Sequence, residues 1–321
     1  MKHAHFHLTS LGYLFMVAFL LFSIVICGQS KLIQHFEHHF SRVWTKKGVK
    51  FEKFEDELGE HAYRVSRTKK PLLVLVHGFG MQSELAFFKN KALLKDYDLL
   101  MPDLLWHGQS KLYETEDNSI QSQVDHLYQI ILNEKITEPF VLVGHSYGGI
   151  VSAYFAEQHP ELVQKLILYD SPACCYSLEI ANQHAQKLGV ENVQELLAPT
   201  SDASAKANLA TAFHHVPWYF KLKVVYRKSV RPKGVETLDA FVLRYLFENS
   251  EELQQHHFNW TMPVYLIWGK FDGLIPLSIQ ESIAQAHQIP KGNCFVLNKS
   301  AHAGNYEQHR KFNNFIRSVA Q

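Results

Sequence analysis

Short apolar runs alternate with longer segments of mixed character along most of the chain. Two strand-like segments, Val49–Phe54 and His61–Arg67, are joined by a polar turn and are expected to pair antiparallel. Continuous β-branched and aliphatic runs follow, which are typical of strands buried on both faces. They are Leu72–Val76, Tyr97–Met101, Phe140–Val143, Lys165–Tyr169, Val264–Trp268 and Cys294–Leu297. This pattern predicts a mostly parallel sheet.

Helix-like segments fill the intervals between these runs, for example Ser119–Asn133 and Ile150–Gln158. The alternation predicts an α/β fold with helices on both faces of the sheet. The interval from Tyr169 to Val264 contains no convincing strand, and its helical patterns lie at Leu178–Leu188, Val193–Leu197 and Thr237–Glu248. We therefore predict a helical insertion after the sixth strand. The expected organisation is an N-terminal segment (1–28), an amphipathic linker helix (29–48), a core in two parts (49–170 and 260–321) and the insertion (171–259).

The N-terminal segment is much more apolar than the rest. Leu8–Cys27 is a run of 20 almost wholly apolar residues, and no Asp, Glu, Lys or Arg occurs from His3 to Ser30. A helix of that length spans ~30 Å, the thickness of the hydrocarbon core of a bilayer. We expect a single uncleaved transmembrane anchor. The alternative is a signal segment cleaved after Gly28, which would give a secreted or periplasmic protein.

An amphipathic segment follows the apolar run. In Lys31–Trp44 the apolar residues recur at steps of three and four, so they share one helical face. Such a helix either lies in the membrane interface or packs on the globular domain.

Charge and cysteine content narrow the function classes. The chain has 32 basic and 31 acidic residues, a net charge of +1, so no nucleic-acid partner is expected. The cysteines after the apolar run are an adjacent pair, Cys174 and Cys175, together with Cys294. This odd set implies no disulfide framework and favours a reducing compartment. The N-terminal histidines lack Cys or carboxylate neighbours at ligand spacing, so no metal site is expected.

The candidate chemistry begins at a Gly-x-Ser-x-Gly motif. The strand Phe140–Val143 runs directly into Gly144-His145-Ser146-Tyr147-Gly148 and then into a helix. This strand-turn-helix context is that of a nucleophile elbow, which projects the serine hydroxyl above the sheet. Gly144 and Gly148 are needed because a Cβ at either position would clash in so tight a turn.

A serine nucleophile needs a base and an acid that holds the base in place. For this kind of elbow the acid and then the histidine follow in chain order, each after a later strand. Asp272 follows the strand Val264–Trp268, and His302 follows Cys294–Leu297. We predict Ser146, Asp272 and His302 as the catalytic residues. Asp170, which follows the sixth strand, is the rival acid.

Backbone N–H groups are also needed to stabilise the oxyanion of the reaction intermediate. The N–H of Tyr147 follows the nucleophile at the start of the helix. The N–H of Phe79 lies on the loop His77-Gly78-Phe79-Gly80 after the strand Leu72–Val76. We predict these two groups as the oxyanion hole.

Together these motifs resemble the α/β-hydrolase superfamily. The resemblance runs from about residue 49 to the end and includes Trp268-Gly269-Lys270-Phe271-Asp272 and Ala301-His302. It implies that the insertion is a cap over the active site and that no metal or organic cofactor is used. One loop departs from the family pattern Asp-x-Pro-Gly-x-Gly-x-Ser, because Leu105 and Trp106 replace its Pro and first Gly. Trp106 either lines the substrate pocket or packs elsewhere, and Asp103 is expected to fix the loop.

Serine at the elbow favours acyl transfer to water, since dehalogenases and epoxide hydrolases of the superfamily use aspartate there. We expect hydrolysis of a carboxylic ester, such as an acylglycerol. The alternatives are a carrier-linked methyl ester, as for the pimeloyl-type esterases that share this fold and triad, carbon–carbon bond hydrolysis, an amidase or peptidase, and an inactive binding protein.

A basic run in the insertion bears on partners. Lys221–Lys233 carries six Lys or Arg residues and no acid, and Trp218 stands just before it. Three interpretations of this run are open. It is a solvated helix face, a surface that binds anionic lipid, or a surface that binds an acidic carrier protein. Trp218 is a second candidate substrate-binding residue.

Overall fold

The computed structural model describes residues 39–113, 117–221 and 238–320. The chain divides into two compact units, Met1–Gly48 and Val49–Gln321. In the first unit, residues 39–45 are helical. The predicted span Leu8–Cys27 and residues 222–233 of the basic run lie outside the described residues. Within the described ranges, none of the helices has both the length and the apolar character needed to cross a bilayer.

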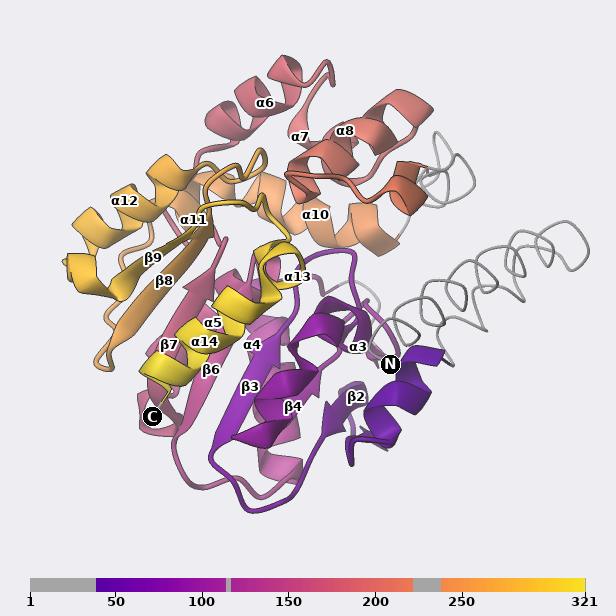
Figure 1. Ribbon diagram of the computed structural model, residues 1–321, viewed down its shortest axis with the longest axis vertical. Helices are drawn as coiled ribbons and strands as arrows, with labels where there is room; N and C mark the ends of the chain where they lie inside the picture. Colours follow the sequence, from indigo (N-terminus) through magenta and orange to yellow (C-terminus); the bar gives the residue numbers. More distant parts are fainter. Residues whose placement is uncertain (1–38, 114–116, 222–237, 321) are drawn as a thin grey trace, which may run out of the picture. The chain divides into compact units, whose positions relative to one another are not determined.

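The second unit is built on one mixed sheet (Figure 1). Its strands run in the order β1 (Lys50–Glu55), β2 (Gly59–Val65), β4 (Asp98–Pro102), β3 (Leu72–Val76), β6 (Phe140–His145), β7 (Val163–Tyr169), β8 (Val264–Gly269) and β9 (Cys294–Leu297). The pairs β1–β2 and β2–β4 are antiparallel, and every pair from β4 to β9 is parallel. This confirms the predicted sheet.

One strand was not predicted. Lys111–Leu112 forms the short strand β5, which pairs antiparallel with Gly59 and Glu60 at the start of β2. Two residues, one of them an exposed lysine, are too few to produce a hydrophobic pattern. The insertion therefore follows β7, which is the sixth of the predicted strands.

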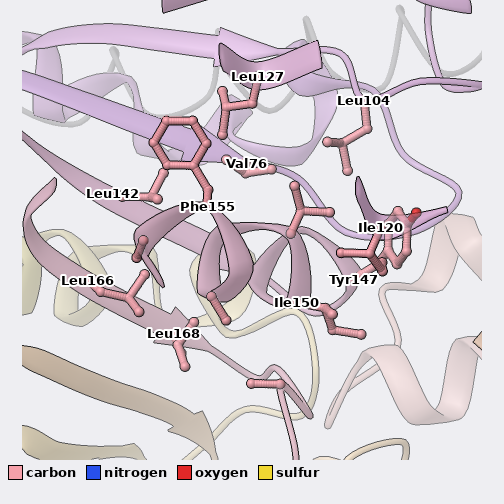
Figure 2. Close-up of a cluster of buried hydrophobic side chains, with 14 of the residues drawn as sticks. Val76, Leu104, Ile120, Leu127, Leu142, Tyr147, Ile150, Phe155, Leu166 and Leu168 are labelled. Carbon is pink, nitrogen blue, oxygen red and sulfur yellow. The ribbon is translucent and has the colours of Figure 1, made fainter. Parts of the chain in front are cut away.

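Alternate residues of the central strands face two different helical layers. On one face, Leu142 of β6 and Leu168 of β7 pack with Phe155 and Ile150 of α5 (Tyr147–Gln158), as Figure 2 shows. The helix α4 (Ile120–Asn133) adds Leu127 to this cluster. Full burial of each such side chain stabilises the fold by ~1.5–3 kcal/mol.

The other face is covered from the C-terminal end of the chain. Tyr169, the neighbour of Leu168, packs edge-on against Phe312 of α14 (His309–Val319), with ring centroids 5.1 Å apart. The remaining helices of the core are α12 (Leu277–Ala286) and the short elements α3 (Ser83–Ala86), η1 (Phe88–Lys95), η2 (Pro160–Leu162), η5 (Lys291–Asn293) and α13 (Gly304–Glu307). The predicted helices on both faces are thus present.

The helical insertion, residues 171–259, lies between β7 and β8. Its described elements are α6 (Leu178–Lys187), α7 (Val193–Leu197), α8 (Asp202–Ala212), η3 (Trp218–Lys221), α10 (Leu238–Glu248) and α11 (Ser250–Gln255). Each of the first three helices begins with a polar N-cap residue. Its side chain accepts a hydrogen bond from the backbone N–H three residues later. The three N-caps are Ser177, Asn192 and Ser201. The described part of the insertion contains no strand, as predicted. Figure 1 shows these helices together beyond one end of the sheet.

Candidate functional site

Ser146 occupies a strained turn between β6 and α5. Its φ of 52° lies in the left-handed region, which costs a non-glycine residue ~1–3 kcal/mol. The turn closes tightly because its glycines lack side chains. A Cβ on Gly144 would come within 2.4 Å of Ser152 Oγ, and one on Gly148 within 2.2 Å of the His77 carbonyl oxygen. These distances give the physical reason for the two glycines of the motif.

His302 and Asp272 meet at the ends of the last two strands. Asp272 follows β8, His302 follows β9, and His302 Nδ1 lies 2.7 Å from Asp272 Oδ2. A carboxylate can only accept, so His302 Nδ1 carries the proton and Nε2 is left as the basic nitrogen. Asp272 Oδ1 accepts the N–H groups of Leu274 and Ile275 at 2.8 and 2.9 Å. Both carboxylate oxygens are therefore held in hydrogen bonds.

The loop that carries His302 is fixed from the core. Tyr169 Oη donates to the carbonyl oxygen of His302 at 2.8 Å, and His145 Nε2 donates to the same oxygen at 3.1 Å. The rings of His145 and His302 pack with centroids 4.8 Å apart. Since His145 immediately precedes Ser146, these contacts bring the histidine loop beside the elbow.

The same loop is also bonded to the insertion. The N–H of His302 donates to the Thr211 carbonyl at 3.3 Å, and the N–H of Ala303 donates to the Ala212 carbonyl at 2.7 Å. Thr211 and Ala212 are the last residues of α8. The backbone around His302 thus bridges α8 and the core.

Glu307 strengthens this bridge. Its carboxylate accepts the N–H of Ala301 at 2.9 Å and the N–H groups of His214 and His215 at 3.1 and 3.0 Å. No local sequence pattern singles out Glu307, because an isolated glutamate is ordinarily a surface residue. Tyr169 and His145 were also missed as supports of the histidine loop.

The loop after β3 orients the Phe79 N–H. His77 Nδ1 lies 2.8 Å from the Gly78 carbonyl oxygen, and His77 Nε2 accepts the N–H of Leu104 at 3.0 Å. Burial, then the neighbouring His107, lowers the pKa of His77 to about 4, so the ring is neutral near pH 7. The Gly78 carbonyl and the Phe79 N–H belong to one planar peptide unit and point in opposite directions. With the carbonyl turned toward His77, the N–H faces away from that ring.

The predicted oxyanion donors lie at the same cavity as the serine. Phe79, Ser146 and Tyr147 all line a cavity of about 800 Å³, a volume that includes its open mouth. A Cβ added to Gly78 would lie 3.1 Å from Ser146 Cβ, so the loop after β3 approaches the elbow closely. The site therefore combines a serine at a helix N-terminus with backbone donors on an adjoining loop.

The wall of the cavity is almost entirely apolar. The core contributes Phe79, Ile150, Leu274 and Ile275 beside Ser146, and the insertion contributes residues from α6, α7, α10 and α11. Those residues are Leu178, Ala181, Val193, Leu197, Leu243, Leu246, Phe247, Ser250, Leu253 and Gln254. No Asp, Glu, Lys, Arg or His is among the described residues that line it. The cavity is suited to an uncharged, hydrocarbon-rich group.

Neither predicted substrate-binding tryptophan is among these lining residues. Trp106 has a φ of 67°, and its Nε1 donates to the Asp117 carbonyl at 3.3 Å. Its ring packs edge-on against Phe241. Trp218 lies in η3 and is 59% exposed. Trp106 therefore packs against Phe241 of α10, and Trp218 is largely exposed.

Asp103, on the loop that departs from the family pattern, is a fixing residue. Its carboxylate accepts the N–H and hydroxyl of Ser83 at 2.9 and 2.6 Å and an Arg64 N–H at 3.3 Å. Gly108 in the same loop has a φ of 55°, and a Cβ there would collide with Asp103. The loop keeps a tight shape without the usual Pro and Gly.

Asp170, the rival acid, lies nearby without bonding His302. One ring nitrogen of His145, one ring nitrogen of His302 and one carboxyl oxygen of Asp170 lie within 4.8 Å of one another. Asp170 Oδ1 accepts the Gly269 N–H at 2.7 Å, whereas Oδ2 has no hydrogen-bond partner. Burial, then the charge of Asp272, raises the pKa of Asp170 well above its usual range. Its surroundings therefore favour the neutral carboxyl group over the carboxylate.

Comparisons with known proteins identify the family of this chain. The model of the alpha/beta hydrolase fold family matches residues 71–308. The pimeloyl-[acyl-carrier protein] methyl ester esterase of Vibrio parahaemolyticus is 26% identical over 264 residues, 78% of this chain and 94% of the esterase. Monoacylglycerol lipase ABHD6 of Homo sapiens is 26% identical over 282 residues, 82% of this chain and 79% of the lipase.

A solved structure extends the likeness to nearly the whole chain. The crystal structure of a membrane phospholipase A covers 97% of this chain and 98% of its own, with a TM-score of 0.72 and 18% identity. At that identity the likeness concerns the fold alone. The family match, however, spans most of the sequence, so this chain belongs to the alpha/beta hydrolase fold family.

Proposed function

We propose that this protein is a serine hydrolase that cleaves carboxylic esters of uncharged acyl chains. Ser146 is the nucleophile, His302 the general base and Asp272 the acid that orients the histidine. The N–H groups of Phe79 and Tyr147 form the oxyanion hole. The observation that carries the proposal is the 2.7 Å bond between His302 Nδ1 and Asp272, which leaves Nε2 as the base in a site whose serine opens onto an apolar cavity.

The proposed reaction has two halves. His302 Nε2 takes the proton of the Ser146 hydroxyl as the oxygen attacks the ester carbonyl, and the two N–H groups stabilise the oxyanion. His302 then protonates the leaving alcohol, and an acyl-enzyme remains. Water attacks that ester by the same sequence of proton transfers, so the acid is released and Ser146 is restored. These steps need only side chains, backbone N–H groups and water.

The cavity supports an acylglycerol or a similar lipid ester as the first substrate class. Its apolar wall fits a hydrocarbon chain, and two of the relatives above are named as an esterase and a monoacylglycerol lipase. A methyl ester on a carrier protein is the second candidate, because the Vibrio relative aligns over 94% of its length. Carbon–carbon bond hydrolysis uses a similar triad and is the third.

We also propose roles for the two regions outside the core. The helical insertion acts as the cap that completes the acyl cavity, since α6, α7, α10 and α11 supply much of its wall. Residues 8–27 act as a membrane anchor that holds the enzyme near lipid, a role supported by their apolar pattern and by the membrane phospholipase A of similar fold.

Labelling with a fluorophosphonate ester, together with hydrolysis assays, tests the catalytic proposal. The full chain in detergent micelles is assayed on p-nitrophenyl esters of graded acyl length, on monoacylglycerols and on a carrier-linked methyl ester. Ser146→Ala should abolish labelling and lower kcat by about 10⁶, leaving ~10³–10⁴-fold over water from the oxyanion hole and binding. Ser282→Ala, at an exposed hydroxyl that donates to the Ser278 carbonyl, is the matched control and should label normally.

The outcomes separate the alternatives. Absence of labelling in the unmodified protein would favour an inactive binding protein on this fold. A preference for the methyl ester over every acylglycerol would favour the carrier-linked substrate.

The anchor is tested on the same full chain expressed in cells. It should remain in the membrane pellet after a carbonate wash, with peptides containing His3 still present. A mature chain that begins at Gln29 would show cleavage and overturn the anchor.

A further inference from the structure

Two adjacent thiols lie in the wall of the acyl cavity. Cys174 and Cys175 are in the loop between β7 and α6, and their Sγ atoms are 3.1 Å apart. Cys174 is buried and lines the cavity, whereas Cys175 is partly exposed. Cys174 Sγ is also 3.3 Å from His287 Nε2, just after α12. The proposed hydrolysis uses none of these three groups.

The backbone of this loop brings the two sulfur atoms together. Side chains of adjacent residues in an extended chain point to opposite sides, so neighbouring cysteines do not normally meet. Here Ala173 has a φ of 33° and Cys175 a φ of 66°, both in the left-handed region. That region is uncommon for residues other than glycine, and for an L-residue it stores strain. The strained loop holds the two thiols facing each other.

We propose that Cys174 and Cys175 form a reversible disulfide that changes the shape of the acyl cavity. The oxidant is a small-molecule disulfide of the glutathione type. The Cys175 thiolate attacks one sulfur of the oxidant, a mixed disulfide forms, and one small thiol leaves. Cys174 then attacks Cys175 Sγ and displaces the second small thiol. The protein loses two protons and two electrons, which reduce the oxidant to two thiols.

The surroundings assign different roles to the two cysteines. Burial, first of all, raises the pKa of the Cys174 thiol, so Cys174 does not start the exchange. Cys175 is the more accessible sulfur and makes the first attack. Burial lowers the pKa of His287 below its usual value, which keeps the ring neutral near pH 7. His287 Nε2 can then accept the Cys174 proton during the second attack.

The disulfide would be easy to reduce. Consecutive Cα atoms are 3.8 Å apart across a trans peptide, whereas disulfides usually join Cα atoms 4.4–6.8 Å apart. A bridge between neighbours is therefore strained, and strained disulfides belong to the labile class. This property suits a modification that is made and removed.

Closure of the ring would act on the substrate pocket. Pro172, Ala173, Cys174 and Tyr176 line the cavity, so four residues of the loop would face an acyl group bound there. Two hydrogen bonds hold the loop at the second thiol and just after it. The Cys175 N–H donates to the Gln254 carbonyl at 3.3 Å, and Tyr176 Oη donates to the Leu274 carbonyl. Because the loop is held there, closing a covalent ring must displace residues that line the cavity, and a long acyl chain depends on that wall more than a short one.

Oxidised glutathione applied to the full chain in detergent micelles tests the proposal. Peptide mapping without reduction should find a Cys174–Cys175 disulfide, and titration should find two fewer free thiols. Because the activity readout rests on the proposed function, the mapping is read independently of it. Hydrolysis of a dodecanoate ester should fall about tenfold, hydrolysis of an acetate ester by less than twofold, and dithiothreitol should reverse both.

Two variants serve as controls. Cys175→Ser cannot form the ring and should keep its dodecanoate hydrolysis in the oxidant. Cys294→Ser removes a partly buried thiol on β9 and should respond like the unmodified protein. A glutathione adduct that persists on Cys175 without ring closure would overturn the proposal, as would equal inactivation of Cys175→Ser. A protein that forms the ring but hydrolyses no ester would contradict the proposed function instead.

Discussion

Two carboxyl groups at the ends of neighbouring strands lie close to the same histidine, yet they have opposite surroundings. Asp272, after β8, receives three hydrogen bonds, from His302 Nδ1 and from two backbone N–H groups. Asp170, after β7, receives one from Gly269, and its second oxygen has no partner. Hydrogen bonds to a carboxylate favour its charged form, and burial without them favours the neutral form. The two acids therefore differ in the number of donors around them, and Asp272 is the one that is hydrogen-bonded to His302.

This comparison predicts very different results for the same substitution at the two acids. Asp272→Asn should lower kcat/KM for ester hydrolysis by about 10⁴, because an amide no longer selects the histidine tautomer with a basic Nε2. Asp170→Asn should cost less than tenfold, since a neutral carboxyl group and an amide have nearly the same shape. Steady-state kinetics of both variants on one ester checks the prediction. If Asp170→Asn is the more damaging change, the acids must be exchanged in our assignment.

Burial raises the pKa of Asp170, and the same effect has the opposite sign for two buried histidines, whose pKa values it lowers. Burial lowers the pKa of His77 to about 4 and that of His126 to about 3, from the ordinary 6.5. The unfolded chain takes up these protons first as the pH falls below 6.5. The contribution of these two histidines to stability is therefore fully present above pH 6.5 and should be lost as the pH falls toward 4. Each histidine should lower the free energy of unfolding by up to about 1.4 kcal/mol per pH unit.

Urea unfolding at pH 7.5, 5.5 and 4.5 measures this loss. His126 is bonded to His61 at Nδ1 and to the Asp103 carbonyl at Nε2, so its burial does not depend on the active site. His126→Gln should reduce the slope of stability against pH between 6.5 and 4. A slope that is unchanged in this variant would show that His126 takes no part in the loss.

The smallest expected effect concerns Asp170 itself. The pKa of Asp170 is raised in the folded state. Its contribution to stability is therefore present at low pH and is lost as the pH rises toward neutrality, because the unfolded chain releases this proton first. Asp170→Asn removes that titration and keeps an oxygen for the Gly269 N–H. Relative to the unmodified protein, the variant should therefore gain stability between pH 4 and pH 7. Parallel denaturation curves at the two pH values check the sign, and a constant difference would mean that Asp170 is ionised in the fold.

Parts of the molecule that depend on local sequence could be predicted closely. The predicted strand Leu72–Val76 is β3 to the residue, and Ser119–Asn133 contains α4 with Ser119 as its N-cap. The turn at Ser146 was also predictable, because its two glycines act within a few residues of the serine. In such places a short pattern determines the backbone.

Features that depend on distant contacts could not be predicted. Glu307 bonds to backbone groups 92 and 93 residues away, and no local pattern signals that arrangement. For a similar reason, the positions of Trp106 and Trp218 relative to the cavity could not be predicted. The place of a tryptophan in the chain says little about the direction in which its side chain points from a loop. Asp170 and Asp272 occupy equivalent positions after strands, and only the donors that surround them in space distinguish the two.

The hydrogen bonds between the histidine loop and α8 link the position of His302 to that of the insertion. The N–H groups of His302 and Ala303 are bonded to the last two residues of α8, and Glu307 holds the two residues that follow Phe213. Any displacement of α8 must therefore stretch these bonds or carry the backbone of His302 with it. The insertion and the loop after β9 are in this way one mechanical unit, so a substitution that shifts α8 should also shift His302.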